Sequence, residues 1–128
     1  MQAENPEDIC RLFQSCMGRG DIDAVLDLYD AEVAFVNEAG AVKTGLEALR
    51  AELAPVAATT PRFDFEVKLI ARSADVALMH TWWTVSSSER EPRSVHAIEV
   101  ARRRPDGTWR WLIGDPFTVG RLSRTRAS

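Results

Sequence analysis

The chain has 128 residues with a formal net charge of -3, and 45% of the residues are hydrophobic and 27% charged. This length suits one domain and is too short for two ordinary ones, and the composition is that of a soluble globular protein. The mild charge gives no general attraction to nucleic acid or to anionic membranes, so we expect neither as a partner. No stretch approaches the roughly 20 apolar residues of a membrane span, and the acidic N-terminus argues against a signal peptide.

The first predicted helix spans residues 6–17, with Asn5 as its N-cap and an apolar stripe at helical spacing. Both cysteines, Cys10 and Cys16, fall in this helix on different sides, so we expect no disulfide between them, and Cys16 belongs to the core face. The chain has no Cys/His spacing typical of metal sites, and we predict neither a metal nor a cofactor. Reduced thiols fit a cytoplasmic protein.

A second helix is predicted from its cap, Asp21, to Tyr29. Its apolar residues again recur at helical spacing. A turn at residues 30–32 then leads into a short strand at residues 33–37.

A capping box predicts the start of the third helix, because Thr44 is followed three residues later by Glu47. We expect Pro55 to end this helix, since proline lacks the backbone N–H that the next turn needs. The pattern then changes to strict alternation at residues 63–70, which is typical of a strand with one buried face.

Three more strands are predicted, at residues 76–85, 94–104 and 108–118. The first of them is apolar on both faces, which places it in the middle of a sheet or against a partner subunit. A polar hairpin tip at residues 86–92 connects it to the next strand. Pro-Asp-Gly at residues 105–107 favours a three-residue loop between the last two strands.

Helices first and antiparallel strands after them predict an α+β fold, in which three N-terminal helices pack on a curved, mainly antiparallel sheet. No internal repeat or linker divides the chain. We therefore expect one domain over residues 1–120, followed by a basic, flexible tail at residues 121–128.

The predicted register of the last hairpin brings two carboxyl groups to one face of the sheet. With a three-residue loop, Glu99 lies opposite Ile113, and Asp115 lies opposite Ala97, so that Glu99 and Asp115 share a face. A two-residue loop would instead bring His96 beside Asp115; we favour the first register. A buried carboxylate near a second one has its pKa raised, and such a pair can divide acid and base roles.

The chain resembles the nuclear transport factor 2-like superfamily, and within it the SnoaL-like and ketosteroid-isomerase-like proteins. The resemblance covers nearly the whole chain and rests on four segments in this order: GDIDA (20–24), LYDAEVAF (28–35), KTGLEAL (43–49) and PDGTWR (105–110). It implies a cone-shaped roll with cystatin-like topology and an apolar cavity between helices and sheet. It does not imply one reaction, because this fold supports isomerases, hydrolases, cyclases and non-catalytic binding modules.

Three positions of ketosteroid isomerases can be matched to this chain. Their general-base aspartate corresponds to Asn37, their tyrosine donor to Phe13, and their protonated aspartate to Glu99. Only Glu99 keeps the required chemistry, so steroid isomerisation is not supported. Epoxide hydrolases of this superfamily match at Asn37 and at Asp115, but Phe35 replaces their tyrosine, and their middle-strand arginine and aspartate are missing.

Two functions therefore stay open. In an enzyme without cofactor, Asp115 acts as base or water activator, Glu99 as its acid partner, and Asn37 positions the ligand. In a binding module, both carboxylates have structural partners and Asn37 bonds the turn that follows its strand. In either case a small hydrophobic molecule is the expected ligand, and the predicted lining is aromatic: Phe13, Phe35, Trp83, Trp111 and Phe117.

We further expect a homodimer that forms through the outer face of the sheet, because Leu78 and Trp82 are apolar residues on the second face of a central strand. His80 and His96 are isolated histidines without the three or four ligands that zinc takes.

Overall fold

The computed structural model describes residues 2–88 and 90–127, and it confirms the predicted α+β class. One curved, open sheet has the strand order β2-β1-β6-β5-β4-β3. All neighbouring strands are antiparallel except β1 and β6, which are parallel. The strands are β1 (Tyr29–Val36), β2 (Val42–Thr44), β3 (Arg62–Ser73), β4 (Val76–Ser87), β5 (Arg90–Arg103) and β6 (Trp109–Asp115).

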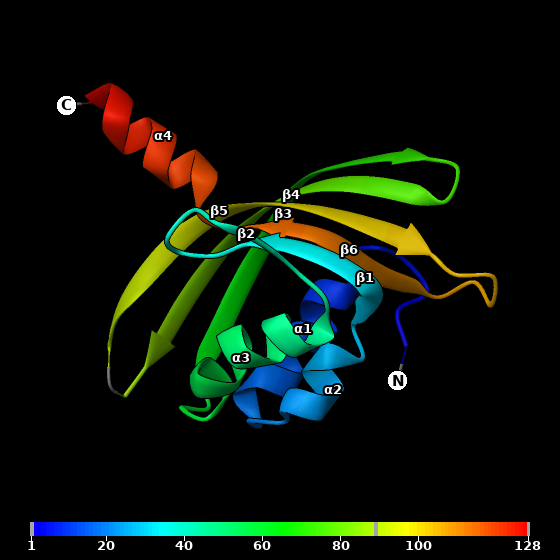
Figure 1. Cartoon of the computed structure of the whole chain (residues 1–128), viewed down its shortest axis with the longest axis horizontal. Helices are drawn as coiled ribbons and strands as arrows, with labels where there is room; N and C mark the ends of the chain where they lie inside the picture. The colour runs from blue at the N-terminus through cyan, green and yellow to red at the C-terminus, as the bar shows by residue number, and fades with distance from the viewer. Residues whose placement is uncertain (1, 89, 128) are drawn as a thin grey trace.

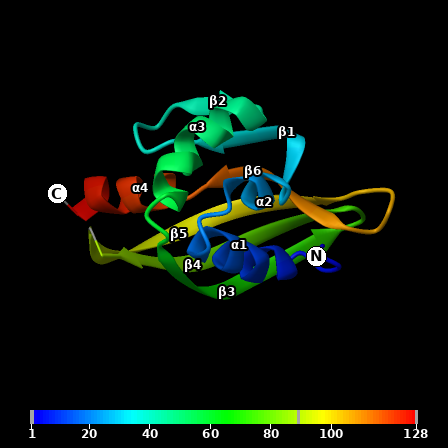
Figure 2. The same ribbon diagram turned by 90° about the horizontal axis from the view of Figure 1, so that it is seen from below.

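Three helices cover the concave face of this sheet, while a fourth projects from one end (Figure 1). They are α1 (Asp8–Gly18), α2 (Ile22–Leu26), α3 (Leu46–Ala57) and, at the C-terminus, α4 (Thr118–Ala127). The view from below shows α1, α2 and α3 lying across the same side of the strands (Figure 2). Helix α1 packs on β3 and β6, and α3 packs on β1 and β2, so the core lies between these two layers.

Helix α1 begins two residues later than predicted, because residues 5–8 form a turn in which the Asn5 carbonyl accepts the Asp8 N–H. The Asp8 carboxylate, rather than the Asn5 side chain, accepts the free N–H groups of Glu4 and Asn5. The predicted apolar stripe is confirmed and fully buried. Both cysteines are free thiols and both are buried, Cys10 as well as Cys16.

Asp21 caps α2 as predicted and accepts the N–H of Ala24 at 3.2 Å. The helix ends at Leu26, however, and Tyr29 is the first residue of β1. The predicted turn at residues 30–32 was wrong, because these residues continue the strand, which begins where Tyr29 pairs with Trp111 of β6. Pairing with Trp111, which is distant in the sequence, thus makes this segment a strand rather than a turn.

The capping box at α3 was also wrong. Thr44 ends strand β2, which was not predicted, and Gly45 is the N-cap residue with a left-handed φ of 92° that favours glycine. Pro55 lies inside the helix, which continues to Ala57. The carbonyl of Ala51, which a residue with an N–H at position 55 would bond, belongs to an exposed residue and can bond water instead.

Two β-bulges change which side chains share a face. In β3, Lys68 has no partner between the pairs Val67–Thr81 and Leu69–His80, so Leu69 turns to the outer face and is 49% exposed. The predicted alternation therefore ends at Val67, and beyond the bulge Ile70, rather than Leu69, packs against the core. Strand β4 lies between β3 and β5 as expected, and its inner residues Ala77, Met79, Thr81 and Trp83 are buried.

The second bulge lies in the last hairpin. Ala101 pairs with Trp111 as predicted, but Val100 pairs with Ile113, which leaves Leu112 as the extra residue. Beyond this point the predicted register was wrong by one residue, so Glu99 lies opposite Gly114. Gly107 in the loop has a left-handed φ of 88°, which favours glycine.

The hairpin tip between β4 and β5 and the C-terminal residues both differ from the prediction. The tip predicted at residues 86–92 is shorter, since Ser87 pairs with Arg90, and Glu89 lies outside the described residues. Residues 121–127, predicted as part of a flexible tail, belong to helix α4, and Ser128 lies outside the described residues.

Candidate functional site

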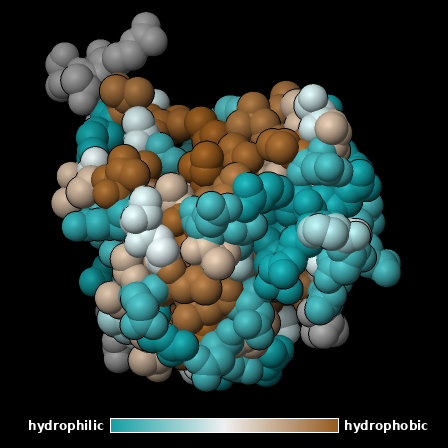
Figure 3. All heavy atoms as spheres, turned by 45° about the vertical axis from the view of Figure 1, so that its right-hand side comes forward, coloured by the Kyte–Doolittle hydropathy of each residue, from teal (hydrophilic) through white to brown (hydrophobic). Residues whose placement is uncertain are grey.

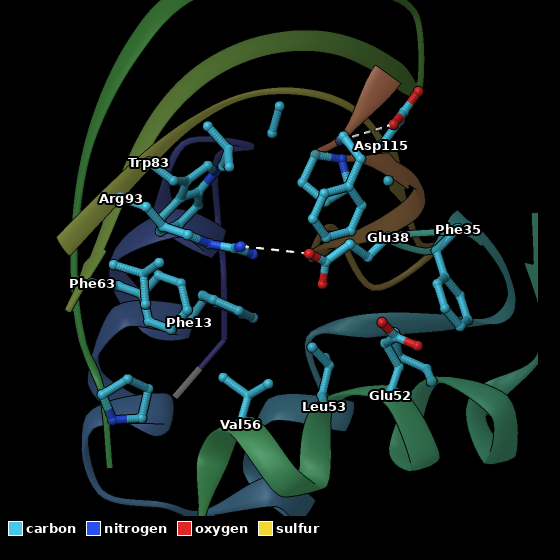
Figure 4. A pocket seen from close by; sticks show the side chains of 18 of the residues that line it. Phe13, Phe35, Glu38, Glu52, Leu53, Val56, Phe63, Trp83, Arg93 and Asp115 are labelled. Carbon is cyan, nitrogen blue, oxygen red and sulfur yellow. Dashed lines mark hydrogen bonds and ion pairs between the residues drawn. The ribbon is translucent and has the colours of Figure 1, made fainter. Parts of the chain in front are cut away.

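A pocket of about 500 Å³ lies between α1, α3 and the inner face of the sheet (Figure 4). Helix α3 contributes Leu53 and Val56 to one wall, and the sheet contributes the opposite wall. All five aromatic residues predicted to line a pocket are found there: Phe13, Phe35, Trp83, Trp111 and Phe117. The buried part is therefore apolar, as expected, whereas the exposed part carries charges that were not predicted.

Edge-to-face contacts between aromatic rings stabilise the buried wall of the pocket. The ring of Phe13 packs edge-on against Phe63, Trp83 and Trp111, with ring centroids 5.1 to 5.5 Å apart. Such contacts stabilise a rigid wall, because edge-to-face pairs add to the burial of their apolar area. Phe13 thus has a packing role at the position where the resemblance suggested a hydrogen-bond donor.

Glu99 is the carboxyl group in this buried part, and only 7% of the residue is exposed. Its Oε1 accepts the hydroxyl of Thr81 at 2.9 Å, and its Oε2 accepts the indole N–H of Trp83 at 3.1 Å. Within the described residues no cationic side chain forms an ion pair with it. Burial therefore raises the pKa of Glu99 to about 7, although the bonds from Thr81 and Trp83 act in the opposite direction.

Gly114 leaves space directly beside this carboxyl. It lies opposite Glu99 in the sheet, and directly opposed residues share a face. A Cβ atom at Gly114 would meet nothing within 4 Å beyond its chain neighbours, and Gly114 lines the pocket. The carboxyl group therefore faces a part of the pocket where a ligand has room.

Two polar residues beside Glu99 were missed by the sequence analysis. Thr81 is fully buried on the inner face of β4, and its place among apolar neighbours at alternate positions was a signal that could have revealed it. Tyr29 lines the pocket from β1, but it was assigned to a helix stripe. Burial, together with the nearby Glu99 and Cys10, raises the pKa of Tyr29 well above its usual range, so the phenol stays protonated.

Asp115 does not share a face with Glu99, because the bulge at Leu112 shifts the register and places Asp115 opposite Ile98. Its Oδ1 accepts the backbone N–H groups of Phe117 and Thr118, at 3.1 and 3.0 Å, where α4 begins. Asp115 still lines the pocket (Figure 4). These bonds agree with the second function considered in the sequence analysis, in which the carboxylate of Asp115 has structural partners.

Asn37 is not among the residues that line the pocket. It follows β1, and its Oδ1 accepts the N–H of Ala41 at 2.9 Å while its backbone closes the turn to Gly40. Ile113, which we expected beside the carboxyl groups, lies on the outer face and is 44% exposed. The structure thus brings Glu99 and the aromatic residues together, but not Asn37.

Charged residues surround the pocket entrance. Arg93 of β5 reaches toward Glu38, which follows β1, and the two side chains meet at 3.5 Å across the pocket (Figure 4). Glu52 of α3 lies below them, and Arg90 and Glu91 also belong to the lining. The exposed part of the pocket is therefore charged, whereas its buried part is apolar.

The outer face of the sheet carries exposed hydrophobic residues, which gather along the upper side of the molecule (Figure 3). They include Val76, Leu78 and Trp82 of β4, each exposed by about two fifths. On this face His80 Nδ1 and His96 Nε2 lie 2.9 Å apart. Among the described residues no group of three or more potential ligands could hold a metal ion, and no helix there is long and apolar enough to cross a membrane.

The chain belongs to the SnoaL-like domain family, whose model matches residues 9–112. This confirms the resemblance seen in the sequence. A comparison with curated proteins finds no match.

Solved structures show the same fold at low identity. One from Thiobacillus denitrificans, assigned to the calcium/calmodulin-dependent protein kinase type II association domain, is 21% identical, with a TM-score of 0.75 over 92% of this chain and 99% of its own. A domain with a cystatin-like fold from Nostoc punctiforme is 16% identical, with a TM-score of 0.73 over 94% and 80%. A ketosteroid isomerase-like protein from Erwinia carotovora atroseptica is 19% identical, with a TM-score of 0.65 over 85% and 89%. At these identities the likeness shows the fold alone.

Proposed function

We propose that the protein binds a small, largely apolar molecule in this pocket and exchanges a proton with it through Glu99. The observation that carries the proposal is a buried carboxyl group that forms no ion pair with a cation of the described residues, next to the open space at Gly114. Its pKa of about 7 means that acid and base forms are both populated near neutral pH. A group with this property can take a proton from one ligand atom and return it to another.

The reaction class that fits is an isomerisation, hydrolysis or cyclisation by acid–base catalysis without cofactor. Glu99 is the proton carrier, and Thr81 and Trp83 fix the orientation of its carboxyl group. Asp115 remains a candidate at the pocket entrance, but its bonds to two backbone N–H groups make Glu99 the better candidate for the base.

The test is a screen of neutral ketones and epoxides for turnover, followed by the variants Glu99→Gln and Asp115→Asn. Glu99→Gln keeps the size and shape of the side chain and one acceptor oxygen, but an amide N–H group replaces the second oxygen and the side chain no longer exchanges a proton. It should lower kcat by roughly 100-fold or more, since general acid–base catalysis contributes about that much. Asp115→Asn should keep most activity. Full activity of Glu99→Gln would refute the assignment.

The second candidate is a binding module without chemistry. It is favoured by the structural bonds of Asp115 and Asn37, which leave Glu99 as the one predicted carboxyl or amide group aimed into the buried part. Gly114→Leu separates pocket function from chemistry, because the new side chain fills the space beside Glu99 without a backbone clash. On either reading Gly114→Leu should abolish ligand binding, whereas Gly114→Ala should weaken it only slightly. A binding module would bind its ligand equally well with Glu99→Gln and would show no turnover.

We also propose that two copies pair through the outer face of the sheet. Support comes from the exposed apolar side chains of Leu78, Trp82 and Ile113 on that face. Leu78→Lys should convert a dimer to a monomer in analytical ultracentrifugation, while Val56→Lys, on a helix at the pocket, should not. A monomeric wild-type protein would refute the pairing.

A further inference from the structure

His80 and His96 form a hydrogen-bonded pair within the exposed apolar patch on the outer face of the sheet. Nδ1 of His80 and Nε2 of His96 lie 2.9 Å apart, and both residues are half-buried. Leu78 and Trp82 flank His80 on β4, because residues two apart in a strand lie on the same face. The ring of Trp82 also packs against that of His96, with centroids 5.5 Å apart. The pair thus lies in the surface through which we propose that two copies associate.

The direct neighbours of the pair on the adjacent strands are apolar. His80 lies between Leu69 of β3 and Ile98 of β5, which are its partners in the sheet. His96 lies opposite Trp82. Directly opposed residues share a face, so all five side chains belong to the outer surface. The two imidazoles are therefore polar groups surrounded by apolar side chains.

Charged groups lie farther from the pair, on the elements that pack beside it. They are Asp64, Glu66 and Lys68 of β3, Arg102 of β5, Arg110 and Asp115 of β6, and Arg121 of α4. Glu66 accepts the ammonium group of Lys68 at 2.8 Å, and Asp115 accepts two backbone N–H groups. In the described part of the chain, neither imidazole forms an ion pair with a carboxylate. A positive charge on these rings is therefore not compensated by a bonded carboxylate.

The hydrogen bond between the two imidazoles requires one proton between the facing nitrogens. A neutral pair or a singly protonated pair provides one N–H donor and one lone-pair acceptor. When both rings are protonated, each facing nitrogen carries a proton, so the bond is lost and two positive charges lie side by side. Histidine is the side chain that ordinarily gains its charge between pH 5 and 8, so this change belongs to mild acid.

We propose that the pair of His80 and His96 is a pH switch for pairing: two copies associate through the outer face while each pair holds one proton between its rings, and they separate in mild acid when both rings are charged. The inference rests on the proposed pairing and adds its regulation. In a separate chain the charged rings can turn toward water. Between two copies the apolar side chains exclude water, so two adjacent charges without a carboxylate are strongly unfavourable. Association therefore excludes protons, and by linkage it weakens as the pH falls.

The experiment measures the dissociation constant of the wild-type dimer by sedimentation equilibrium at pH 7.5 and pH 5.5. One excluded proton per dimer should weaken association about tenfold over this range, and one proton per copy should weaken it about 100-fold. The double variant His80→Gln/His96→Gln removes both histidines of the chain, and its dissociation constant should change by about twofold or less. Thr84→Val is the matched control on the same face of β4. It removes a hydroxyl that bonds Ser94, and it should keep the wild-type response to pH.

A second readout counts the protons and needs no variant. Dilution of wild-type protein in a calorimeter at pH 5.5, in two buffers with different heats of ionisation, gives the number of protons taken up when the dimer separates. We expect an uptake of about one to two protons per dimer. Near-ultraviolet circular dichroism at the same pH should be that of the folded chain, because the switch separates the copies without unfolding them.

The possible outcomes separate this inference from the pairing on which it rests. Wild-type protein that is monomeric at both pH values would overturn the pairing and the switch together. A dimer whose dissociation constant does not change with pH, or that takes up no proton when it separates, would overturn the switch while the pairing stands. A pH dependence that persists in His80→Gln/His96→Gln, or a loss of the near-ultraviolet signal at pH 5.5, would assign the separation to other groups or to unfolding and would overturn the role of the histidine pair.

Discussion

Two buried carboxyl groups of this protein have opposite surroundings. Asp30, near the start of β1, and Glu99, in the pocket, are each less than a tenth exposed. The carboxylate of Asp30 accepts the backbone N–H of Glu32 at 2.9 Å and the guanidinium of Arg102 at 2.9 Å. Among the groups of the described residues, Glu99 accepts only the hydroxyl of Thr81 and the indole N–H of Trp83.

The different surroundings shift the pKa values of these two carboxyl groups in opposite directions. Burial raises the pKa of Asp30, but the bond from Glu32 and the charge and bonds of Arg102 outweigh it, so the net pKa is lowered. For Glu99, burial outweighs two neutral donors, and the pKa rises to about 7. Asp30 is therefore a charged group that ties β1 to β5, while Glu99 can gain and lose a proton near neutral pH.

The largest expected effect is the pH dependence that Glu99 gives to stability. Its pKa is higher in the folded chain, about 7, than the ordinary value of 4.5. The folded state therefore keeps its full stability below pH 4.5 and loses part of it as the pH rises to 7, on the order of 3 kcal/mol in total. Glu99→Gln should be more stable than wild type by that order at about pH 8 and similar to it near pH 4.5, as measured by urea unfolding.

Thr81→Val sharpens this prediction, because the bond from Thr81 lowers the pKa of Glu99. Removing it should move the pH at which stability is lost to a higher value. A Glu99→Gln difference that does not change with pH would show that Glu99 is charged in the folded protein, and would refute its role as a proton carrier.

A smaller effect is expected for Asp30. Asp30→Asn keeps the acceptor for the Glu32 N–H but loses the charge that faces Arg102, and should lower the free energy of unfolding by roughly 1 kcal/mol. Since the pKa of Asp30 is lowered in the fold, this contribution is present above its ordinary value of 3.8 and is lost as the pH falls below it. The difference between variant and wild type should therefore shrink in acid, the reverse of the Glu99 profile. A difference that grows below pH 3.8 would contradict the assignment.

Periodicity in the sequence predicted most of the fold and the inner positions of Phe13 and Trp83, while the resemblance to a known family implied the pocket that they line. The stripe that contains Phe13 and the alternation that contains Trp83 depend on local spacing, which the sequence displays directly. What could not be predicted depends on contacts between distant strands. Tyr29 lies in a strand because it pairs with Trp111, and no local pattern marks that pairing.

The bulges explain the error in the predicted carboxyl pair. Neither Lys68 nor Leu112 differs from an ordinary strand residue, yet each shifts the register by one position. A shift of one residue moves a side chain to the other face of the sheet. The shift in β6 explains why Asp115 was assigned the wrong neighbour and why Gly114, which leaves space beside Glu99, was overlooked. Glu99 itself lines the pocket, as its predicted inward orientation requires.

The smallest effect on stability is expected at the pocket entrance, where Arg93 and Glu38 are 46% and 66% exposed. An ion pair this exposed contributes at most about 0.5 kcal/mol, so Arg93→Gln should leave the free energy of unfolding nearly unchanged. The pair spans the pocket, however, and its loss should speed both association and dissociation of a small apolar fluorescent probe such as 1-anilinonaphthalene-8-sulfonate in stopped-flow fluorescence (Figure 4). Added salt should speed the same rates in wild-type protein and have little effect on the variant. Unchanged rates in Arg93→Gln would show that ligands enter by another route. A large loss of stability would show that the Arg93–Glu38 ion pair contributes as much to the free energy of unfolding as the more buried pair of Asp30 and Arg102.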